Sequence, residues 1–437
     1  MKVLFIRTTL ACAITLTSSL FSVLPGLDMS YVQASEDTNK VEKKRKRTPA
    51  LGARVYSQLA RAQEVADAGD MQAGLDILDQ VKSKSSSLNS YERAMLHNFY
   101  GFIYYNAGKT EQAIAEFEQV VAQDPIPESL EKGTLFSLAQ LSMASGNYGK
   151  TISFLDRWDE VNQGLAPINN NVLRAQASYQ SKDYKNAAKY IESVITQAAE
   201  QETEAEETWY ILQRAVYFEL KDNKKVTAIL EQMVRLFNKP EYWLQLAGMY
   251  GELEQEDKQL AVMEAAYQQG YVTQKSELMT LSQIYYFNGL PYKAAKVLSQ
   301  GIEQKIIEKN AKNLKFLAQS WQGAKEADKA IAVLNQLASI TDDGNADVNI
   351  AEIYLQQGKS ELVIKHAEQA ITRGKLNNSG NAYLALGMAN VNLKQLDSAL
   401  EAFKSAKEIP SSQRMATQWL KFVEQEQQNI KQLAALK

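Results

Sequence analysis

A sequence repeat with a period of about 34 residues constrains the fold of this chain more than any other feature. Its clearest copy covers residues 94–125, with small residues at the eighth and twentieth positions and aromatic residues at the eleventh and twenty-fourth. Small side chains at these positions let two helices approach closely, and the aromatic rings fill the remaining space. The copy contains Tyr100, Gly101, Tyr104, Gly108, Ala113, Phe117 and Pro125.

The same frame recurs along the chain, and ten units can be placed at spacings of 33 to 39 residues. Such spacing is typical of the tetratricopeptide repeat (TPR), a pair of antiparallel helices. Each stacked unit contacts only its neighbours, so the array tolerates variation in length. We therefore predict an all-α fold over residues 48–410, a TPR α-solenoid that forms a superhelix of about ten repeats. The units begin near Val55, Ala94, Lys132, Ile168, Glu207, Pro240, Lys275, Ala311, Gly344 and Gly380.

Residues 411–437 are predicted to form a C-terminal capping helix. Apolar residues recur there at helical spacing, with glutamines and charged residues opposite them. A helix with one polar face can seal the last apolar surface of a repeat array. The apolar residues are Met415, Trp419, Phe422 and Val423.

Residues 1–34 have the features of a secretory signal peptide. A short basic stretch precedes an apolar one over residues 10–24, and helix-breaking Pro25-Gly26 follows. The small residues of Val32-Gln33-Ala34 predict cleavage after Ala34. An uncleaved anchor is the alternative, but the apolar stretch is shorter than the roughly 20 residues that span a bilayer. The single cysteine, Cys12, would be removed, so we expect no disulfide and no cysteine-ligated metal.

Residues 35–47 are predicted to form a disordered basic arm. Its alternative role is peripheral contact with an anionic membrane surface or an acidic protein. The whole chain has 48 basic and 51 acidic residues and a net charge of −3, which disfavours nucleic acid as a partner. The basic residues of the arm are Lys40, Lys43, Lys44, Arg45, Lys46 and Arg47.

Motifs for catalysis or cofactor binding are weak in this sequence. Residues 107–110 resemble the end of a phosphate-binding loop, but Ile103 stands where the first glycine is needed. The acidic residues near Asp343 lack the glycine and the final glutamate of a calcium loop. His97 and His366 fall in separate repeats, so a zinc site or a catalytic triad is not expected. We predict no cofactor, no metal and no enzymatic activity, although a pair of catalytic carboxylates stays open because acidic residues are abundant.

The inner surface of the array is the candidate binding site. In a TPR superhelix, the ninth and twelfth positions of the first helix line the concave groove, and here they are rich in glutamine and aromatic residues. Glutamine amides can pair with an extended peptide backbone, and tyrosine supplies flat contact area. The alternative is that these residue types are simply common in the chain. The candidate residues are Tyr105, Gln140, Gln176, Tyr179, Phe218, Gln283, Tyr286 and Gln319.

Five segments of residues 47–158 carry a further similarity, namely residues 47–51, 59–63, 88–95, 98–106 and 125–130. Through these segments, the stretch resembles the N-terminal half of the TPR proteins that are encoded beside TonB, ExbB and ExbD in gammaproteobacteria. Within this stretch, Asn89 and Glu92 also predict a helix cap with its reciprocal acid, and Pro127 predicts a first helical turn. The resemblance implies a periplasmic accessory of TonB-dependent energy transduction and uptake, and it implies no catalytic residue.

Two functional hypotheses follow. The preferred one is a non-catalytic periplasmic scaffold that binds peptide-like segments of protein partners, such as TonB-system components or the periplasmic segments of outer-membrane receptors. The alternative is a TPR scaffold for another process of the cell envelope, such as outer-membrane or cell-wall assembly.

Overall fold

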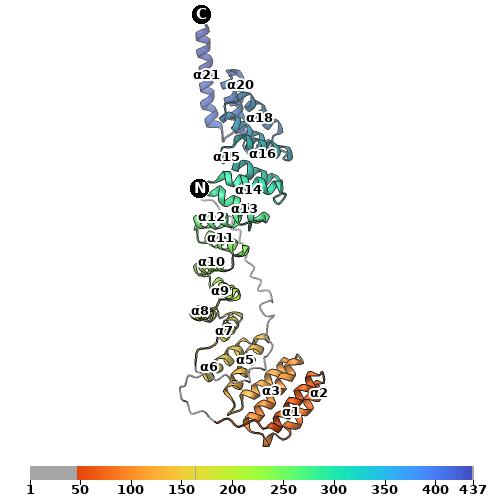
Figure 1. Ribbon diagram of the computed structural model, residues 1–437. Coiled ribbons are helices and arrows are strands. Elements are labelled where there is room, and N and C mark those ends of the chain that lie inside the picture. Colours follow the sequence, from red (N-terminus) through yellow and green to blue (C-terminus); the bar gives the residue numbers. More distant parts are fainter. Residues whose placement is uncertain (1–46, 163, 436–437) are drawn as a thin grey trace. The chain divides into compact units, whose positions relative to one another are not determined.

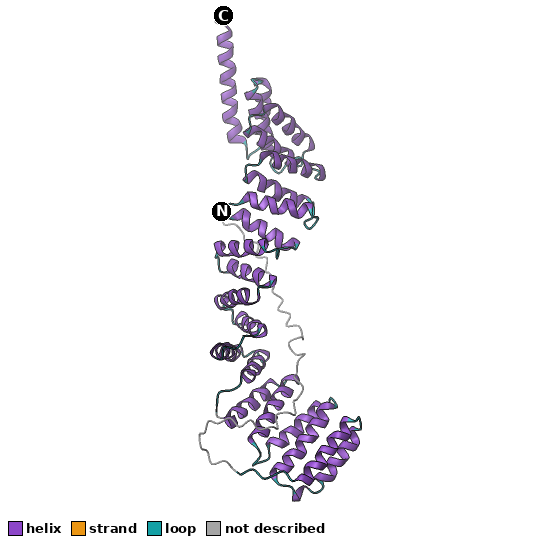
Figure 2. Cartoon of the chain, in the orientation of Figure 1, coloured by secondary structure: helices purple, strands orange, loops and turns teal. Residues whose placement is uncertain are grey.

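The computed structural model describes residues 47–162 and 164–435. The predicted signal peptide and residues 35–46 of the predicted basic arm lie outside this range. The described residues form 21 α-helices and one short 3₁₀ helix, with no strand among them (Figure 2). The all-α prediction is therefore confirmed.

The helices fall into two units, the first ending at Leu253 and the second beginning at Glu254. Figure 1 labels the helices in chain order. The first unit contains α1 (Ala53–Asp67), α2 (Met71–Lys82), the 3₁₀ helix η3 (Ser85–Ser87), α3 (Ser90–Asn106), α4 (Thr110–Val121), α5 (Glu128–Ala144), α6 (Tyr148–Asn162), α7 (Ile168–Gln180), α8 (Tyr184–Glu200), α9 (Glu207–Glu219), α10 (Asn223–Phe237) and α11 (Pro240–Glu252). The second contains α12 (Glu256–Gln268), α13 (Lys275–Phe287), α14 (Pro291–Glu303), α15 (Ala311–Gly323), α16 (Ala327–Ile340), α17 (Asn345–Gln356), α18 (Ser360–Arg373), α19 (Ser379–Asn392), α20 (Leu396–Lys407) and α21 (Gln413–Ala435).

The predicted repeat frame matches the helices. Each of the ten expected repeats begins within four residues of the start of an odd-numbered helix from α1 to α19. Within each unit of the structure, consecutive helices pack against one another along the chain, as a stacked array requires. The described residues thus form the predicted α-solenoid.

The close packing inside a pair is clearest between α3 and α4. A Cβ atom added at Gly101 would lie 2.6 Å from the ring of Phe117, which is buried. In the last pair, a Cβ at Gly387 would lie 2.5 Å from the ring of Phe403. Only glycine lets the two helices approach this closely. The small and aromatic positions of the repeat therefore face each other, as the sequence predicts.

The start of α3 also follows the sequence prediction. The Asn89 side chain accepts a hydrogen bond from the Glu92 backbone N–H at 2.9 Å. The Glu92 carboxylate accepts one from the Asn89 backbone N–H at 3.0 Å. This reciprocal cap satisfies two N–H groups that lack partners within the helix. Pro127 differs slightly from its prediction, because it is the N-cap residue of α5 and not part of its first turn.

The last helix, α21, packs on α20 as expected of a capping helix. Its contact face is formed by Ala416, Leu420 and Val423, all of which are buried. Met415 and Phe422 do not belong to this face, because each stays about half exposed. The sequence prediction, which grouped both with Val423, is wrong on this point. No helix in residues 47–162 or 164–435 is both long and apolar enough to cross a membrane.

Candidate protein-binding surface

Five of the predicted groove residues lie in the first unit, on the first helices of successive repeats. Among these helices, α7 contacts both α5 and α9. Phe218 is the most exposed of the five, with 45% of its surface accessible, and the others are partly buried. Tyr105 lies on α3, Gln140 on α5, Gln176 and Tyr179 on α7, and Phe218 on α9.

The two tyrosines of this group differ in their surroundings. Tyr105 packs against the apolar cluster around Phe117, so part of its ring belongs to the core. Tyr179 lies with its ring 5.6 Å from the ring of Tyr184. Burial raises the pKa of Tyr179, and the nearby carboxylate of Glu219 raises it further. Tyr179 therefore presents a neutral hydroxyl that can donate or accept a hydrogen bond.

The other three predicted residues lie in the second unit, on two neighbouring first helices. Gln283 and Tyr286 are on α13, and Gln319 is on α15. Both glutamines are exposed. The Tyr286 ring joins the helices, because its centroid lies 5.5 Å from the centroid of Phe316 on α15.

Phe287 enlarges this aromatic surface, although it was not among the predicted residues. Its ring lies 5.7 Å from that of Tyr286, edge to face, and 70% of its surface is exposed. Its exposed ring adds apolar area beside the Tyr286 ring at the end of α13. The signal was present in the sequence as the doublet Tyr286-Phe287.

The eight predicted residues thus form two groups, one in each unit. Within the second unit, the ring of Tyr286 contacts Phe287 and, on α15, Phe316, and Gln283 and Gln319 are exposed on these two helices. Within the first unit, Gln176 and Tyr179 share one helix, and Phe218 lies on the next first helix. Whether these residues bind a peptide stays a prediction.

A second set of polar contacts, which sequence reasoning missed, joins consecutive repeats. Tyr217 of α9 donates a hydrogen bond to Glu192 of α8. Lys225 of α10 forms an ion pair with the same carboxylate at 3.0 Å and lies over the Tyr217 ring at 5.2 Å. The hydrogen bond from Tyr217 and the charge of Lys225 lower the pKa of Glu192. The side chains of Tyr217, Glu192 and Lys225 thus bind one another and hold consecutive repeats together. They are therefore not available for a ligand.

In the second unit, a lysine likewise lies over a tyrosine ring and pairs with a carboxylate, around Tyr285 of α13. Lys293 of α14 lies over its ring at 5.4 Å and pairs with Glu264 of α12 at 2.5 Å. In both cases the lysine follows the tyrosine by eight residues in the sequence. That spacing is the signal that could have revealed the contact.

Arg174 of α7 is another residue that sequence reasoning missed. Only 2% of its side chain is exposed, and its guanidinium contacts Asp159 of α6 at 2.6 Å and Asp156 at 3.3 Å. It also lies 5.8 Å from the ring centre of Tyr190 on α8. Arg174 stands one residue before the small position of its repeat, where an apolar side chain is usual. A charge at that position could have been noticed.

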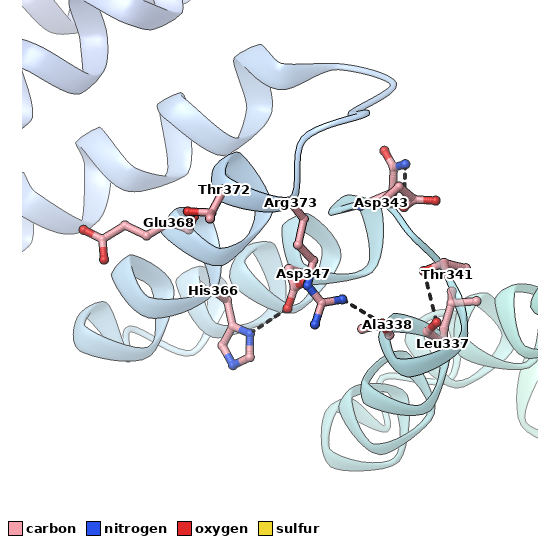
Figure 3. Close-up of polar contacts among 10 residues, drawn as sticks. Leu337, Ala338, Thr341, Asp343, Asp347, His366, Glu368, Thr372 and Arg373 are labelled. Atoms are coloured by element: carbon pink, nitrogen blue, oxygen red, sulfur yellow. Dashed lines mark hydrogen bonds and ion pairs between the residues drawn. The ribbon is translucent and has the colours of Figure 1, made fainter.

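The two histidines contribute to packing between helices. His97 Nδ1 lies 2.6 Å from the Glu116 carboxylate. His366 Nδ1 of α18 lies 3.3 Å from Asp347 of α17, and Arg373 Nε approaches the same buried carboxylate at 3.4 Å (Figure 3). Arg373 also donates to the Ala338 carbonyl at the end of α16. Across the part of the chain that the structure describes, no cluster of three or more potential metal ligands occurs.

Comparison with known proteins supports the repeat assignment. Two family models described as tetratricopeptide repeat match the chain, one at residues 100–125 and one at residues 380–413. These segments include the two glycine–phenylalanine contacts, Gly101 with Phe117 and Gly387 with Phe403. No curated protein matches the sequence.

Several solved structures are similar to this one at low sequence identity. The structure of Naa15/Naa10 bound to HypK-THB has 14% identity and a TM-score of 0.43, and the match covers 87% of this chain. This chain spans 62% of the length of that chain. A tetratricopeptide repeat protein from Parabacteroides merdae has 14% identity and a TM-score of 0.30, with 59% of this chain and 98% of that chain covered. The TPR2AB-domain:pHSP90 complex of yeast Sti1 has 17% identity and a TM-score of 0.29, with 67% of this chain and 98% of that chain covered.

Folds built from this repeat are typically non-catalytic scaffolds for protein interactions. The matched segments are tetratricopeptide repeats, and the stacked helix pairs show that the described residues form an α-solenoid.

Proposed function

We propose that this protein is a periplasmic interaction scaffold, an accessory of a TonB-dependent energy-transduction and uptake system, that binds peptide-like segments on its first helices. The observation that carries the binding proposal is the amide and aromatic surface of α13 and α15. There, Gln283 and Gln319 are exposed on the two helices that the ring contact between Tyr286 and Phe316 joins, and Phe287 lies beside Tyr286.

The chemistry of this surface fits an extended segment of a protein partner. A glutamine amide offers both donors and an acceptor, so it can pair with the N–H and C=O groups of an extended backbone. The rings of Tyr286 and Phe287 supply rigid apolar area at little cost in side-chain entropy. None of these four side chains carries a charge, so the surface favours a neutral segment.

The first unit contributes a second surface of the same kind. Gln176 and Tyr179 are partly exposed on α7, and Phe218 is exposed on the neighbouring helix α9. A segment bound there could contact the amide of Gln176, the neutral hydroxyl and ring of Tyr179, and the ring of Phe218. We propose that this surface also binds a partner.

The periplasmic location and the TonB-system role rest on the sequence. The signal-peptide features of residues 1–34 support export, and we expect a mature protein that begins at Ser35. Intact-mass measurement of the periplasmic fraction tests this expectation, and recovery of the full chain in the inner membrane would contradict it. The resemblance of residues 47–158 to TPR proteins encoded beside TonB, ExbB and ExbD supports the choice of partner system.

The binding proposal is tested by capture of the periplasmic domain of TonB on the immobilised mature protein. We expect the double variant Gln283→Ala/Gln319→Ala to reduce capture while leaving the melting temperature unchanged. The double variant Gln176→Ala/Tyr179→Ala should also reduce capture without unfolding the protein, although loss of the partly buried Tyr179 ring should lower its melting temperature. The matched control is Asn335→Ala/Gln336→Ala, which removes two exposed polar side chains from the second helix α16. Equal capture by all variants would exclude the first-helix surfaces as the binding site. Failure of the wild type to capture TonB would favour the alternative envelope process.

A further inference from the structure

The C-terminal helix α21 has two apolar faces, of which one is covered. Ala416, Leu420 and Val423 are buried against α20, and the Gln427 side chain donates to Asp397 at the start of α20 at 2.8 Å. The second face carries large apolar side chains that stay open to solvent. These are Met415 at 48% exposure, Phe422 at 47% and Ile430 at 53%, with Trp419 partly exposed between them.

The exposed side chains form one continuous stripe along the helix. With 100° of rotation per residue, the side chains from Met415 to Ile430 fall within a sector of roughly 80°. The stripe is centred about 90° from the buried face and runs for roughly 22 Å. A second helix can therefore pack on α21 without displacing α20. The members of the stripe are Met415, Trp419, Phe422, Glu426 and Ile430.

One hydrogen-bond donor and one acceptor in the stripe lack partners. In the described part of the chain, no hydrogen bond or ion pair involves the Trp419 indole N–H or the Glu426 carboxylate. Trp419 contacts Phe403 and Phe422 through its ring alone, at centroid distances of 5.5 and 5.7 Å. A partner helix that covers the stripe must offer an acceptor opposite Trp419 and a donor opposite Glu426, because buried polar groups need hydrogen bonds.

We propose that the stripe pairs with the same stripe of a second copy of this chain, in antiparallel orientation about a two-fold axis near Phe422. Two-fold symmetry then places Trp419 of each copy opposite Glu426 of the other, so the donor and the acceptor meet twice. Met415 lies opposite Ile430, and the two Phe422 rings meet at the axis. A two-fold interface requires such a self-complementary surface.

The order of residues along the stripe selects the antiparallel arrangement. Parallel pairing would place Glu426 against Glu426 and Trp419 against Trp419, which sets like charges together and leaves both indole donors unpaired. The open flank of the stripe is formed by uncharged Gln418, Gln425 and Asn429. Two copies can therefore approach there without repulsion between like charges.

The area available predicts a weak dimer. Each copy contributes four large side chains and one carboxylate, which places the interface at the low end of specific interfaces, below about 1,200 Å² in total. The dimer should therefore form only as the protein concentration rises. Sedimentation velocity of the mature protein over a concentration series should show the mass moving from one copy towards two.

The variant Phe422→Glu should abolish this increase in mass, because it places two like charges at the axis. Since Phe422 is half exposed and outside the α20 contact, the circular dichroism and melting temperature should not change. The matched control is Gln428→Glu, which adds the same charge on a side of α21 away from both apolar faces. A wild-type protein that stays monomeric at every concentration, or a dimer that persists in Phe422→Glu, would overturn the proposal.

Disulfide trapping tests the orientation of the pair. In a chain with Cys12→Ser, which carries no other cysteine, we would introduce Met415→Cys or Ile430→Cys. An equal mixture of the two variants should form the mixed 415–430 disulfide, whereas each variant alone should form little. Efficient 415–415 and 430–430 disulfides would indicate parallel pairing and contradict the proposal. None of these variants touches the first-helix surfaces, so the outcome is independent of TonB capture.

Discussion

Gly101 of α3 faces the ring of Phe117 of α4 so closely that a Cβ atom at Gly101 would lie 2.6 Å from the ring. Gly387 and Phe403 repeat this relationship in the last helix pair, at 2.5 Å. Both phenylalanines are almost fully buried, so neither ring can move aside without disturbing its neighbours. The contact sets how closely the two helices of a repeat can pack.

Replacing Gly101 by leucine should therefore destabilise the array. We expect a loss of about 1–3 kcal/mol in the free energy of unfolding, because the new side chain overpacks the contact with Phe117. Urea denaturation measures the effect. The matched control is Gly133→Ala in α5, where an added Cβ would meet no atom within 4 Å. That change should be neutral or stabilising by up to about 1 kcal/mol, and equal midpoints for both variants would contradict the predicted contact.

Arg174 offers a test of the buried polar contact between α6, α7 and α8. Arg174→Ala should cost about 2–4 kcal/mol, because it empties a buried site and removes the partner of Asp159. The matched control is Lys189→Ala, since Lys189 also lies over the Tyr190 ring, at 5.9 Å, but is exposed. Its effect should stay within about 0.5 kcal/mol. Similar losses for both variants, measured by thermal unfolding, would show that burial of Arg174 has little influence on stability.

The fold could be predicted from the sequence because TPR packing depends on residues close together in the chain. The small and aromatic positions of one repeat, such as Gly101 and Phe117, are only 16 residues apart and belong to one helix pair. The cap formed by Asn89 and Glu92 is more local still. Such short-range patterns can be recognised even in repeats whose other positions differ from the repeat pattern.

Contacts between repeats could not be predicted in the same way. The carboxylates that pair with Arg174 come from the preceding repeat, so the pattern of its own repeat does not indicate whether the charge is buried or solvated. On α21, helical spacing marked Met415, Phe422 and Val423 as apolar, but the spacing alone does not tell which of two adjacent faces packs on α20. The predicted groove residues have the same weakness, since their positions follow from the frame while their exposure depends on neighbouring helices.

Tyrosine ionisation should report the integrity of both units. Burial and a hydrogen bond to Glu231 raise the pKa of Tyr250 to about 12, and burial and the nearby Glu264 carboxylate raise that of Tyr285 to about 12. An unfolded tyrosine ionises near pH 10. Between about pH 10 and 12 the unfolded state therefore binds fewer protons than the folded one, so the stability that these groups provide is present below pH 10 and is lost as pH rises towards 12.

Absorbance of tyrosinate at 295 nm follows this titration directly. We expect the folded protein at pH 11 to show less tyrosinate than the same protein in urea. The variants Tyr250→Phe and Tyr285→Phe should each remove one late-titrating group, leaving the remaining curve unchanged. A folded protein whose tyrosines all titrate near pH 10 would contradict the buried environments described for these two side chains.

The salt dependence of partner capture distinguishes the repeat surfaces from the basic arm. If Gln283, Tyr286 and Gln319 make the contacts, capture should weaken only modestly between low and physiological salt, because amides and neutral rings are not screened by ions. Deletion of residues 40–47, which removes six basic side chains, should then leave capture nearly unchanged. If the basic arm binds the partner through its charges, capture should instead fall steeply at about 0.15 M salt. In that case, capture should not change in the double variant Gln283→Ala/Gln319→Ala. Comparing wild type, deletion and double variant at both salt concentrations therefore assigns the binding element to one region of the chain.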